Sequence, residues 1–430
     1  MKTPSAKPGR QIWLAAGLRT PFARADGPLA ALDSIELSVP VAKAMAGRLA
    51  TGAPDIMVWG AVVPSLGWSN IAREVLIEAG LDPHIPAFST VMACSTSMVG
   101  AFEAAGLLGA AGRELALIGG VDSLSRVQIG LTQGLSDWLR RFGQARSLGE
   151  RARRLGALKL SDVRLYAPGV VNRTTGLSMG EHTEITAKQW GIGRIEQDAN
   201  ALDSHRRAVA AWDRGFFADL VQPLAGIQRD GGPRSSSSLE ELAKLRPAFD
   251  RTSGQGTLTA GNSTPLTDGA AGVWVATEAG LTRLPATTPR VKLVDFEITA
   301  VDFRVDGLLM APAFAIPKLL ARHGLIYTDV DLWEIHEAFS AQVLFHIKAL
   351  EDRNFVREKA GVDRDLGDFP RGRVNPNGGS VALGHPFGAT GARILSQAVK
   401  ELRARPSGAR AIVSVCADGG LGTVALLEAA

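Results

Sequence analysis

The two cysteines are the residues of this sequence whose surroundings best suit chemistry. Cys94 and Cys416 are the only ones, which excludes a disulfide-rich scaffold. Cys94 lies in Thr90-Val-Met-Ala-Cys-Ser-Thr-Ser-Met-Val-Gly100, where a β-branched run stops and an alanine-rich helix is expected to begin. The positive end of that helix favours the thiolate, the nucleophilic form of cysteine. We therefore predict that Cys94 is a nucleophile; the alternative is a small buried hydrophobic side chain.

His385 is the candidate general base for that thiol. It lies in the glycine-rich segment Asn375–Ala392 and precedes Pro386, which prevents helix at the histidine and fixes the entry into the next helix. Glycine lets other backbone segments approach closely. A histidine held at such a turn can accept the proton of a thiol. The alternative is a histidine that only caps the turn.

Other candidates lie at the carboxyl ends of apolar runs, where functional groups of α/β folds gather. Cys416 ends one run and precedes a glycine-rich turn, so its thiol could donate and accept a proton while N–H groups of the turn stabilise an oxyanion. His336 and Glu337 end the run Leu332–Ile335. This pair could position a water or hold a carbonyl oxygen, or form only a local hydrogen bond.

Short apolar runs alternate with alanine-rich helical segments, a pattern typical of α/β layers. The expected strands are 11–16, 56–62, 115–119, 291–298, 332–335 and 411–415, and the expected helices are 70–79, 97–108, 198–214, 312–323 and 389–403. Three similarities between the two ends of the chain occur in the same order: 55–62 with 329–336, 93–109 with 378–402, and 116–120 with 411–420. We interpret them as an internal duplication.

The region between the two similar ends has longer and less regular loops, as in an inserted segment that covers a substrate. We predict an N-terminal half over 1–124, completed by 250–285, an insert over 125–249 and a C-terminal half over 286–430. The insert is basic: nine Lys or Arg residues and two Asp or Glu between Leu139 and Arg173 give a local charge of +7. Such a stretch is typical of contact with a nucleotide phosphate, a membrane surface or an acidic partner, or of a solvated helical face.

Composition excludes several classes of protein. Hydrophobic residues make up 46% of the 430 residues and charged residues 21%, with a formal net charge of +4, as in an ordinary folded chain. No apolar run reaches the ~20 residues that span a bilayer, and the first ten residues lack the apolar core of a secretory signal. We expect a cytoplasmic protein, or a matrix protein if the source is eukaryotic. Without a CxxC or comparable Cys/His cluster we expect no metal site, and we expect no nucleic-acid partner.

A hydrolase is an alternative suggested by Gly176-Leu-Ser-Met-Gly180, which matches the G-x-S-x-G nucleophile elbow with Ser178 as nucleophile. That elbow must follow an apolar strand. The preceding Val171-Asn-Arg-Thr-Thr175 is a poor strand, so the pattern argues against the hydrolase.

Taken together, six segments resemble the motifs of the thiolase family, in that family's order. They are Arg19-Thr-Pro-Phe, Ala93-Cys-Ser-Thr-Ser97, Gly261-Asn-Ser-Thr-Pro-Leu-Thr-Asp-Gly-Ala-Ala271, His336-Glu-Ala-Phe, Gly384-His-Pro-Phe-Gly-Ala-Thr-Gly and Cys416-Ala-Asp-Gly-Gly-Leu-Gly. The resemblance covers residues 11–428. It implies the thiolase fold, an α/β architecture of two duplicated halves in five α-β-α-β-α layers with a loop domain inserted into the first half.

The resemblance also implies a reversible ping-pong reaction, with coenzyme A as a substrate and no permanently bound cofactor. Cys94, activated by His385, would attack the ketone of a 3-ketoacyl-CoA to give an acyl-enzyme and acetyl-CoA, and a second CoA would take the acyl group. Cys416 would move the proton of the acetyl-CoA carbanion. One oxyanion hole would consist of His385 and a water held by His336, and the other of the backbone N–H groups of Cys94 and Asp418.

Further contacts and partners follow from the resemblance alone. The side chains implied to contact substrate or CoA are Ser178, Met179, Thr264 and Glu337. His336 stands where many thiolases have Asn. A His at this position resembles the β-subunits of trifunctional fatty-acid oxidation complexes. This implies a homodimer or tetramer with a hydratase–dehydrogenase α-subunit as partner. The membrane-surface contact through 140–173 is expected from the local positive charge and not from the resemblance. Asp418, where the family usually has Gly or Ala, adds a carboxylate near the carbanion.

Three related functions remain as alternatives. An acetyl-CoA acetyltransferase specific for acetoacetyl-CoA would use the same residues. A decarboxylating ketosynthase shares the fold and uses one Cys with two His, but it has no use for Cys416. A silent lipid-binding homologue would not need both cysteines and His385, all of which this chain has.

Overall fold

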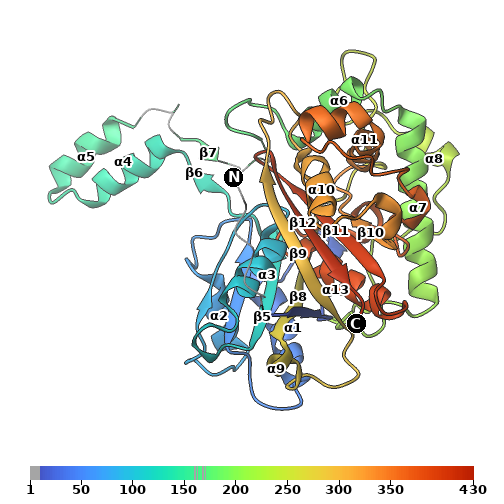
Figure 1. Cartoon of the computed structure of the whole chain (residues 1–430). Helices are drawn as coiled ribbons and strands as arrows, with labels where there is room; N and C mark the ends of the chain where they lie inside the picture. Colours follow the sequence, from blue (N-terminus) through green and yellow to red (C-terminus); the bar gives the residue numbers. More distant parts are fainter. Residues whose placement is uncertain (1–9, 159–160, 162, 167–168, 170) are drawn as a thin grey trace, which may run out of the picture.

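One long mixed sheet organises the chain, of which the computed structural model describes residues 10–158, 161, 163–166, 169 and 171–430 (Figure 1). Its strands lie in the order β4-β3-β5-β8-β1-β9-β12-β11-β10. Their bounds are β1 Ile12–Ala15, β3 Ile56–Ala61, β4 Ala87–Phe88, β5 Leu115–Asp122, β8 Thr267–Thr277, β9 Arg290–Ala300, β10 Leu332–Ile335, β11 Arg410–Ala417 and β12 Leu421–Glu428. A short strand β2, Ala23–Arg24, pairs with β8.

The sheet consists of two copies of one four-strand pattern, which confirms the predicted duplication. In the first half β3 is parallel to β5, β5 is antiparallel to β8, and β8 is antiparallel to β1. In the second half β10, β11, β12 and β9 repeat the same order and directions. The two copies join where β1 pairs with β9. Trp59 on β3 and Trp333 on β10, equivalent in the sequence comparison, are both fully buried.

Helices complete five layers around this sheet. α3, Thr96–Leu107, and α13, Thr390–Arg403, contact each other and lie between the two halves of the sheet. α1, Ser34–Gly47, and α2, Ile71–Glu78, cover the outer face of the first half. α10, Ala311–Arg322, covers the outer face of the second half, with α11, Ser340–Glu351, packed on it. These contacts are the expected α-β-α-β-α arrangement.

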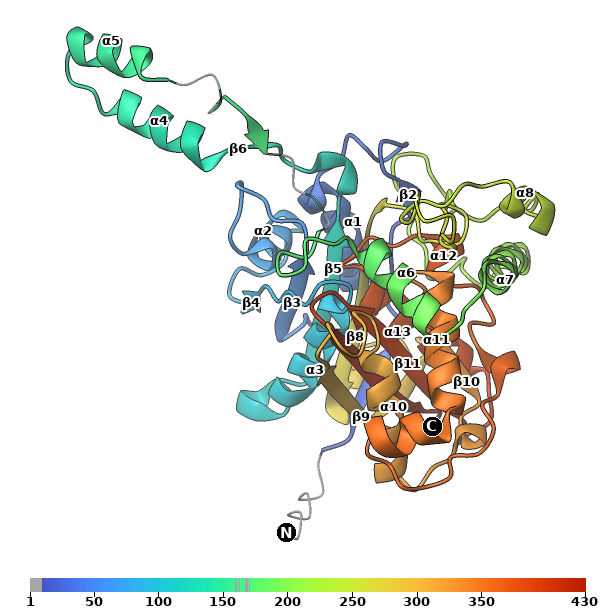
Figure 2. The same ribbon diagram turned by 90° about the horizontal axis from the view of Figure 1, so that it is seen from above.

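Residues 125–249 divide into two structurally different parts. The described residues of 130–166, which are 130–158, 161 and 163–166, form an arm that projects from the body (Figures 1 and 2). The arm contains the strand pair β6, Gly130–Leu131, and β7, Leu165–Tyr166, and the helices α4, Gln133–Gly143, and α5, Leu148–Gly156. The helices α6, Met179–Gln189, α7, Arg194–Asp213, and α8, Leu239–Ala243, return to the body, where α6 and α7 contact α11. The domain boundaries at 124, 249 and 285 stay a prediction.

The two remaining α-helices of the described residues are short: α9, Glu278–Leu281, and α12, Ser380–Leu383. Among the described residues, each helix is too short or too polar to cross a membrane.

Candidate active site

Cys94 lies in the tight turn between β4 and α3, as the sequence predicts. The preceding Ala93 has a left-handed backbone with φ 45°, a conformation that costs a non-glycine residue about 1–3 kcal/mol. Thr96 fixes the turn, since its Oγ1 accepts from Met92 N at 2.9 Å and donates to Ala93 O at 2.8 Å. The Cys94 side chain is 4% exposed. The fold therefore holds a strained backbone directly before this thiol.

His385 meets Cys94 across the two halves of the molecule, with its Nε2 3.1 Å from Sγ. Its other ring nitrogen, Nδ1, lies 2.5 Å from Thr390 Oγ1. Thr390 donates its own proton to Pro386 O at 2.9 Å, so its oxygen must accept from Nδ1–H. A neutral His385 then carries its proton on Nδ1 and turns the lone pair of Nε2 toward Cys94. This is the tautomer that a base for the thiol requires.

The protonation state of this pair differs from the sequence-based prediction. Burial, with the carboxylates of Asp418 and Asp122 as further causes, raises the pKa of the Cys94 thiol to about 12. Burial, with the nearby Arg393, lowers the pKa of His385 to about 3. The helix N-terminus favours the thiolate, as expected from the sequence, but loss of hydration outweighs it. Cys94 and His385 form a neutral thiol–imidazole pair.

Cys416 lies near the end of β11 and belongs to the same site. It is buried, and burial, followed by the neighbouring Cys94 thiol, raises the pKa of its thiol well above the usual range. Ser95, next to the nucleophile, donates to Val415 O at 3.1 Å and so ties the two cysteine segments together. Asp418 begins the turn after β11 and is partly exposed, with its carboxylate accepting from Gly419 N at 2.8 Å.

His336 lies beside His385, with the two ring centroids 4.2 Å apart. A ring nitrogen of each histidine and Sγ of Cys94 lie within 4.8 Å of one another. Nδ1 of His336 is 2.8 Å from Ser380 Oγ, whereas its buried Nε2 has no hydrogen-bond partner among the described residues. An unpaired buried donor or acceptor is uncommon in a folded protein and requires an explanation, such as a catalytic role or a bound water or ion. The three donors also have a spacing that a metal ion could use, a possibility that sequence spacing did not indicate.

Glu337 and Thr264 hold the loops of the site together. The buried carboxylate of Glu337 accepts from Ser204 Oγ at 2.7 Å, Asn375 Nδ2 at 2.9 Å and Val381 N at 3.1 Å. Thr264 Oγ1 donates to the backbone oxygen of Ser380 at 2.9 Å. In this structure both residues connect the His336 loop to the His385 loop, and their expected contact with substrate stays a prediction.

Ser178 is the N-cap of α6 and does not have the surroundings of a nucleophile. Its Oγ and its backbone N–H both donate to Glu181, each at 2.7 Å, in a capping box. Met179 begins the helix and packs against the core of the C-terminal half. A serine paired with a carboxylate and no imidazole lacks the base that the hydrolase alternative requires.

Three residues of the site were not predicted from the sequence: Thr390, Ser380 and Asp122. Asp122 ends β5, and its carboxylate accepts from the backbone of Val63 at 2.8 Å and of Gly388 at 2.7 Å. It thereby attaches the loop of His385 to the N-terminal half. Its position at the end of a strand was the one available signal.

Comparisons with known proteins agree with this geometry. A family model described as thiolase, N-terminal domain, matches residues 12–279, and one described as thiolase, C-terminal domain, matches residues 287–429. The chain is 39% identical to a 3-ketoacyl-CoA thiolase of Yersinia enterocolitica and 38% identical to one of Pectobacterium atrosepticum, in each case over 428 residues, 98% of this chain and 97% of that protein.

Two solved structures are similar over nearly the whole chain. An acetyl-CoA acetyltransferase of Bacillus anthracis has a TM-score of 0.79 and 29% identity, covering 98% of this chain and 99% of that one. The Acat5 thiolase from Ascaris suum in complex with coenzyme A has a TM-score of 0.78 and 27% identity, covering 98% of this chain and 100% of that one. The two family models match both halves of the chain, and Cys94 and His385 form a buried pair where these halves meet. The chain therefore belongs to the thiolase family of acyltransferases.

Proposed function

We propose that this thiolase cleaves 3-ketoacyl-CoA with CoA, yielding acetyl-CoA and an acyl-CoA shortened by two carbons, through an acyl-enzyme on Cys94. The observation that carries the proposal is the 3.1 Å contact between Cys94 Sγ and His385 Nε2, in the tautomer that leaves Nε2 free to accept a proton. The names of the two bacterial relatives support the choice of substrate.

The chain's own residues account for each proton of the reaction. Cys94 gives its proton to His385 as sulfur attacks the C3 ketone, and the bond between C2 and C3 then breaks. Cys416 protonates the resulting acetyl-CoA carbanion. The thiol of the second CoA attacks the acyl-enzyme and its proton restores Cys416, while His385 returns its proton to the leaving sulfur of Cys94. The sum is one 3-ketoacyl-CoA and one CoA converted to acetyl-CoA and a shorter acyl-CoA.

Two groups of donors support the oxygen atoms on which charge develops. The backbone N–H groups of Cys94 and Asp418 serve the ketone oxygen at the acylated carbon. His385, once it holds the thiol proton, serves the thioester oxygen together with the group at position 336. Such donors stabilise charge strongly because the site is buried and the donors are already oriented.

Acylation of Cys94 tests this proposal directly. Intact-mass spectrometry after incubation with acyl-CoA should show one added acyl group in the native enzyme and none in Cys94→Ser, whose circular dichroism should be unchanged. In Ser178→Ala, which tests the hydrolase alternative, any acyl group added should still be on Cys94. Acylation that persists in Cys94→Ser would overturn the mechanism.

The acyl chain length separates the main proposal from an acetyltransferase specific for acetoacetyl-CoA. Thiolysis should be measured with 3-ketoacyl-CoA substrates from four carbons upward. Activity confined to the four-carbon substrate would establish the narrower function. Release of CO₂ from a malonyl thioester during condensation would instead establish a ketosynthase.

CoA binding is proposed for the segments around Ser178, Met179 and Thr264. Two cations line a cavity that also includes Ser263 and Pro265, the neighbours of Thr264 in the chain. Arg24 and Arg234 line this cavity together with Ser263 and Thr267, whose hydroxyl accepts from the backbone N–H of His385 at 2.7 Å. Two guanidinium groups suit phosphate oxygens. Arg234→Ala should therefore raise the KM for CoA while leaving acylation of Cys94 by a short pantetheine thioester unchanged.

Partners and location are also proposed. We propose a homodimer or tetramer that works in the cytoplasm, with no permanent cofactor or metal, and with a hydratase–dehydrogenase partner or an anionic membrane surface bound by the arm. The arm supports this because none of the residues of α4 and α5 is buried, and Leu148 and Leu155 are 83% and 59% exposed beside its arginines. Light scattering of the purified enzyme measures the assembly, and cell fractionation the location.

A further inference from the structure

Ser380 contacts two groups that together determine where its own proton points. It begins α12 and is fully buried. Its Oγ lies 2.7 Å from a guanidinium nitrogen of Arg393 and 2.8 Å from Nδ1 of His336. A guanidinium group has protons on every nitrogen and no lone pair, so Arg393 can only donate, and Ser380 Oγ must accept from it.

The proton of Ser380 then has one acceptor in reach, which is Nδ1 of His336. If Nδ1 carried a proton, Arg393 and His336 would both donate to the same oxygen, and the buried hydroxyl proton would have no partner. The alternative in which Ser380 donates to Nδ1 satisfies all three groups. A neutral His336 must then carry its single proton on Nε2.

Two other observations agree with that placement. Burial, followed by the neighbouring His385 and Arg393, lowers the pKa of His336 well below its usual value, so the ring is neutral at physiological pH. Its Nε2 is buried and has no partner among the described residues. An N–H group at Nε2 of His336 is therefore a hydrogen-bond donor without an acceptor, and it lies beside the thiol of Cys94.

We propose that Ser380, held by Arg393, is a positioning residue that fixes His336 with its proton on Nε2, so that His336 itself donates a hydrogen bond to the thioester oxygen of the substrate. The two histidines of the site therefore hold opposite tautomers: Thr390 keeps the proton of His385 on Nδ1, and Ser380 keeps the proton of His336 on Nε2. Once His385 accepts the proton of Cys94, both rings present Nε2–H to the oxygen.

This inference rests on the proposed function and replaces the water expected between position 336 and the oxygen. It also gives Ser380 a role that depends on the presence of histidine at position 336. An asparagine at 336 has its own amide N–H groups and needs no hydroxyl to select a tautomer.

The first experiment measures the tautomer in the free enzyme, without any assay of activity. Imidazole ¹⁵N chemical shifts of histidine-labelled enzyme, with the His336 signals assigned by their loss in His336→Asn, should show a bare Nδ1 and a protonated Nε2. Ser380→Ala should change those shifts and leave the signals of His346 unchanged. A protonated Nδ1 on His336 in the native enzyme would overturn the inference even if the enzyme proves to be an active thiolase.

The second experiment separates positioning from packing. Ser380→Ala should slow carbon–carbon cleavage by at least about tenfold, up to the 10²–10³-fold typical of one lost oxyanion donor. In a His336→Asn background the same substitution should change the rate less than about twofold, because no tautomer remains to be selected. The matched control is Ser414→Ala, a buried serine of β11 whose hydroxyl has no partner among the described residues and whose loss should leave the rate unchanged. An equal loss in both backgrounds would make Ser380 structural and would overturn the proposed role.

Discussion

Cys94 lies two residues before α3, yet its thiol is enclosed by protein and lies near the carboxyl groups of Asp122 and Asp418. Because removal of a charge from water costs more than the end of one helix returns, the resting thiol keeps its proton. His385 is neutral for the same reason. We therefore expect proton transfer to accompany attack on the substrate.

A first prediction concerns this resting state. With the pKa of Cys94 near 12, the thiol form persists below that value, so ultraviolet thiolate absorbance of Cys94 should be absent from pH 6 to pH 9. The measurement is the difference spectrum between native enzyme and Cys94→Ser, with Cys416→Ala as the control for the second thiol. A thiolate signal at neutral pH that only Cys94→Ser removes would show an ion pair with His385 and contradict the prediction.

Cys416 should matter for one half of the reaction only. If its thiol moves the proton of the carbanion, Cys416→Ala should slow thiolysis of 3-ketoacyl-CoA by about 10²–10⁴-fold, the usual contribution of a general acid or base. Exchange of deuterium into the methyl group of acetyl-CoA should slow to a similar extent. Acylation of Cys94 by a simple acyl-CoA, which forms no carbanion, should change little. Equal losses in acylation and thiolysis would mean that Cys416 only shapes the site.

The reactive residues could be predicted from the sequence, whereas their supporting hydroxyl groups could not. Cys94, His385, Cys416 and His336 stand at recognisable strand ends and turns, and the fold brings them together. Ser380 lies 44 residues from His336, and nothing local indicates which serine will meet a ring nitrogen. The state of the Cys94 thiol was also beyond reach, because burial and the charge of Asp418 depend on tertiary packing.

At the scale of secondary structure, all six expected strands and five expected helices are present, with ends shifted by a few residues. The strand β8 was missed because its sequence contains two glycines and three alanines, a composition more typical of turns or helices. The small residues of β8 allow neighbouring elements to pack closely against the strand. A Cβ at Gly272 would lie 2.5 Å from the sulfur of Met45 in α1, so glycine permits the close approach of α1 to the sheet.

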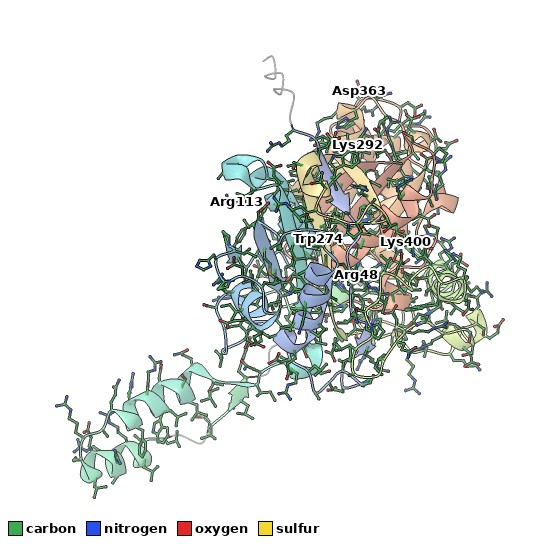
Figure 3. All side chains as sticks on the ribbon, turned by 90° about the horizontal axis from the view of Figure 1, so that it is seen from below. Arg48, Arg113, Trp274, Lys292, Asp363 and Lys400 are labelled. Atoms are coloured by element: carbon green, nitrogen blue, oxygen red, sulfur yellow. The ribbon has the colours of Figure 1, made fainter. Side chains whose placement is uncertain are left out.

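The arm is another element whose position could not be predicted from the sequence. Its helices are strongly basic and no residue of either helix is buried, although Trp138 stacks on Phe142 with ring centroids 5.1 Å apart and its Nε1 donates to Arg154 O at 2.8 Å. Figure 3 shows side chains extending from both helices away from the rest of the molecule. The sequence indicated an unusual basic segment, and the structure adds that it is a helical hairpin far from the sheet.

We predict that the arm binds a polyanion and does not take part in the chemical step. Replacing Arg151 and Arg153, two exposed arginines of α5, with Ala should leave turnover of a short substrate nearly unchanged. Binding to vesicles that contain anionic lipid should weaken by ~1 kcal/mol per charge and less at high salt. The exposed Arg206 and Lys318, changed to Ala on the body of the protein, are the matched control.

The outcomes of that experiment distinguish the alternatives for the arm. Weaker binding to vesicles in the arm variant alone supports a membrane surface. A higher KM for CoA would place the arginines on the phosphates of CoA. Unchanged binding and unchanged KM would mean that the basic segment is a solvated helical face and that the prediction is wrong.

At the scale of the whole molecule, the active site exists because two similar halves face each other. Cys94 belongs to the N-terminal half, whereas His385, His336 and Cys416 belong to the C-terminal half. Asp122 connects them by accepting N–H groups from both. The central helices α3 and α13 begin two residues after Cys94 and five residues after His385, so the packing of these helices sets the distance between nucleophile and base.

Gly391 is the point in α13 where this packing can be tested. A Cβ at this position would lie 2.4 Å from the backbone nitrogen of Met98 in α3, and a backbone atom within a helix cannot move aside alone. We expect Gly391→Ala to push α3 and α13 apart, to destabilise the fold by about 1–3 kcal/mol as overpacking usually does, and to lengthen the 3.1 Å contact between Cys94 and His385. Thermal unfolding and the rate of Cys94 acylation measure the two effects.

Gly106→Ala is the matched control, because that exposed position in α3 has no atom within 4 Å of the added Cβ. Alanine at position 106 should stabilise the helix by up to about 1 kcal/mol without changing the rate of acylation. If Gly391→Ala lowered stability but left acylation intact, the spacing of the two helices would not control the catalytic pair, and the pair would be positioned by its own turns.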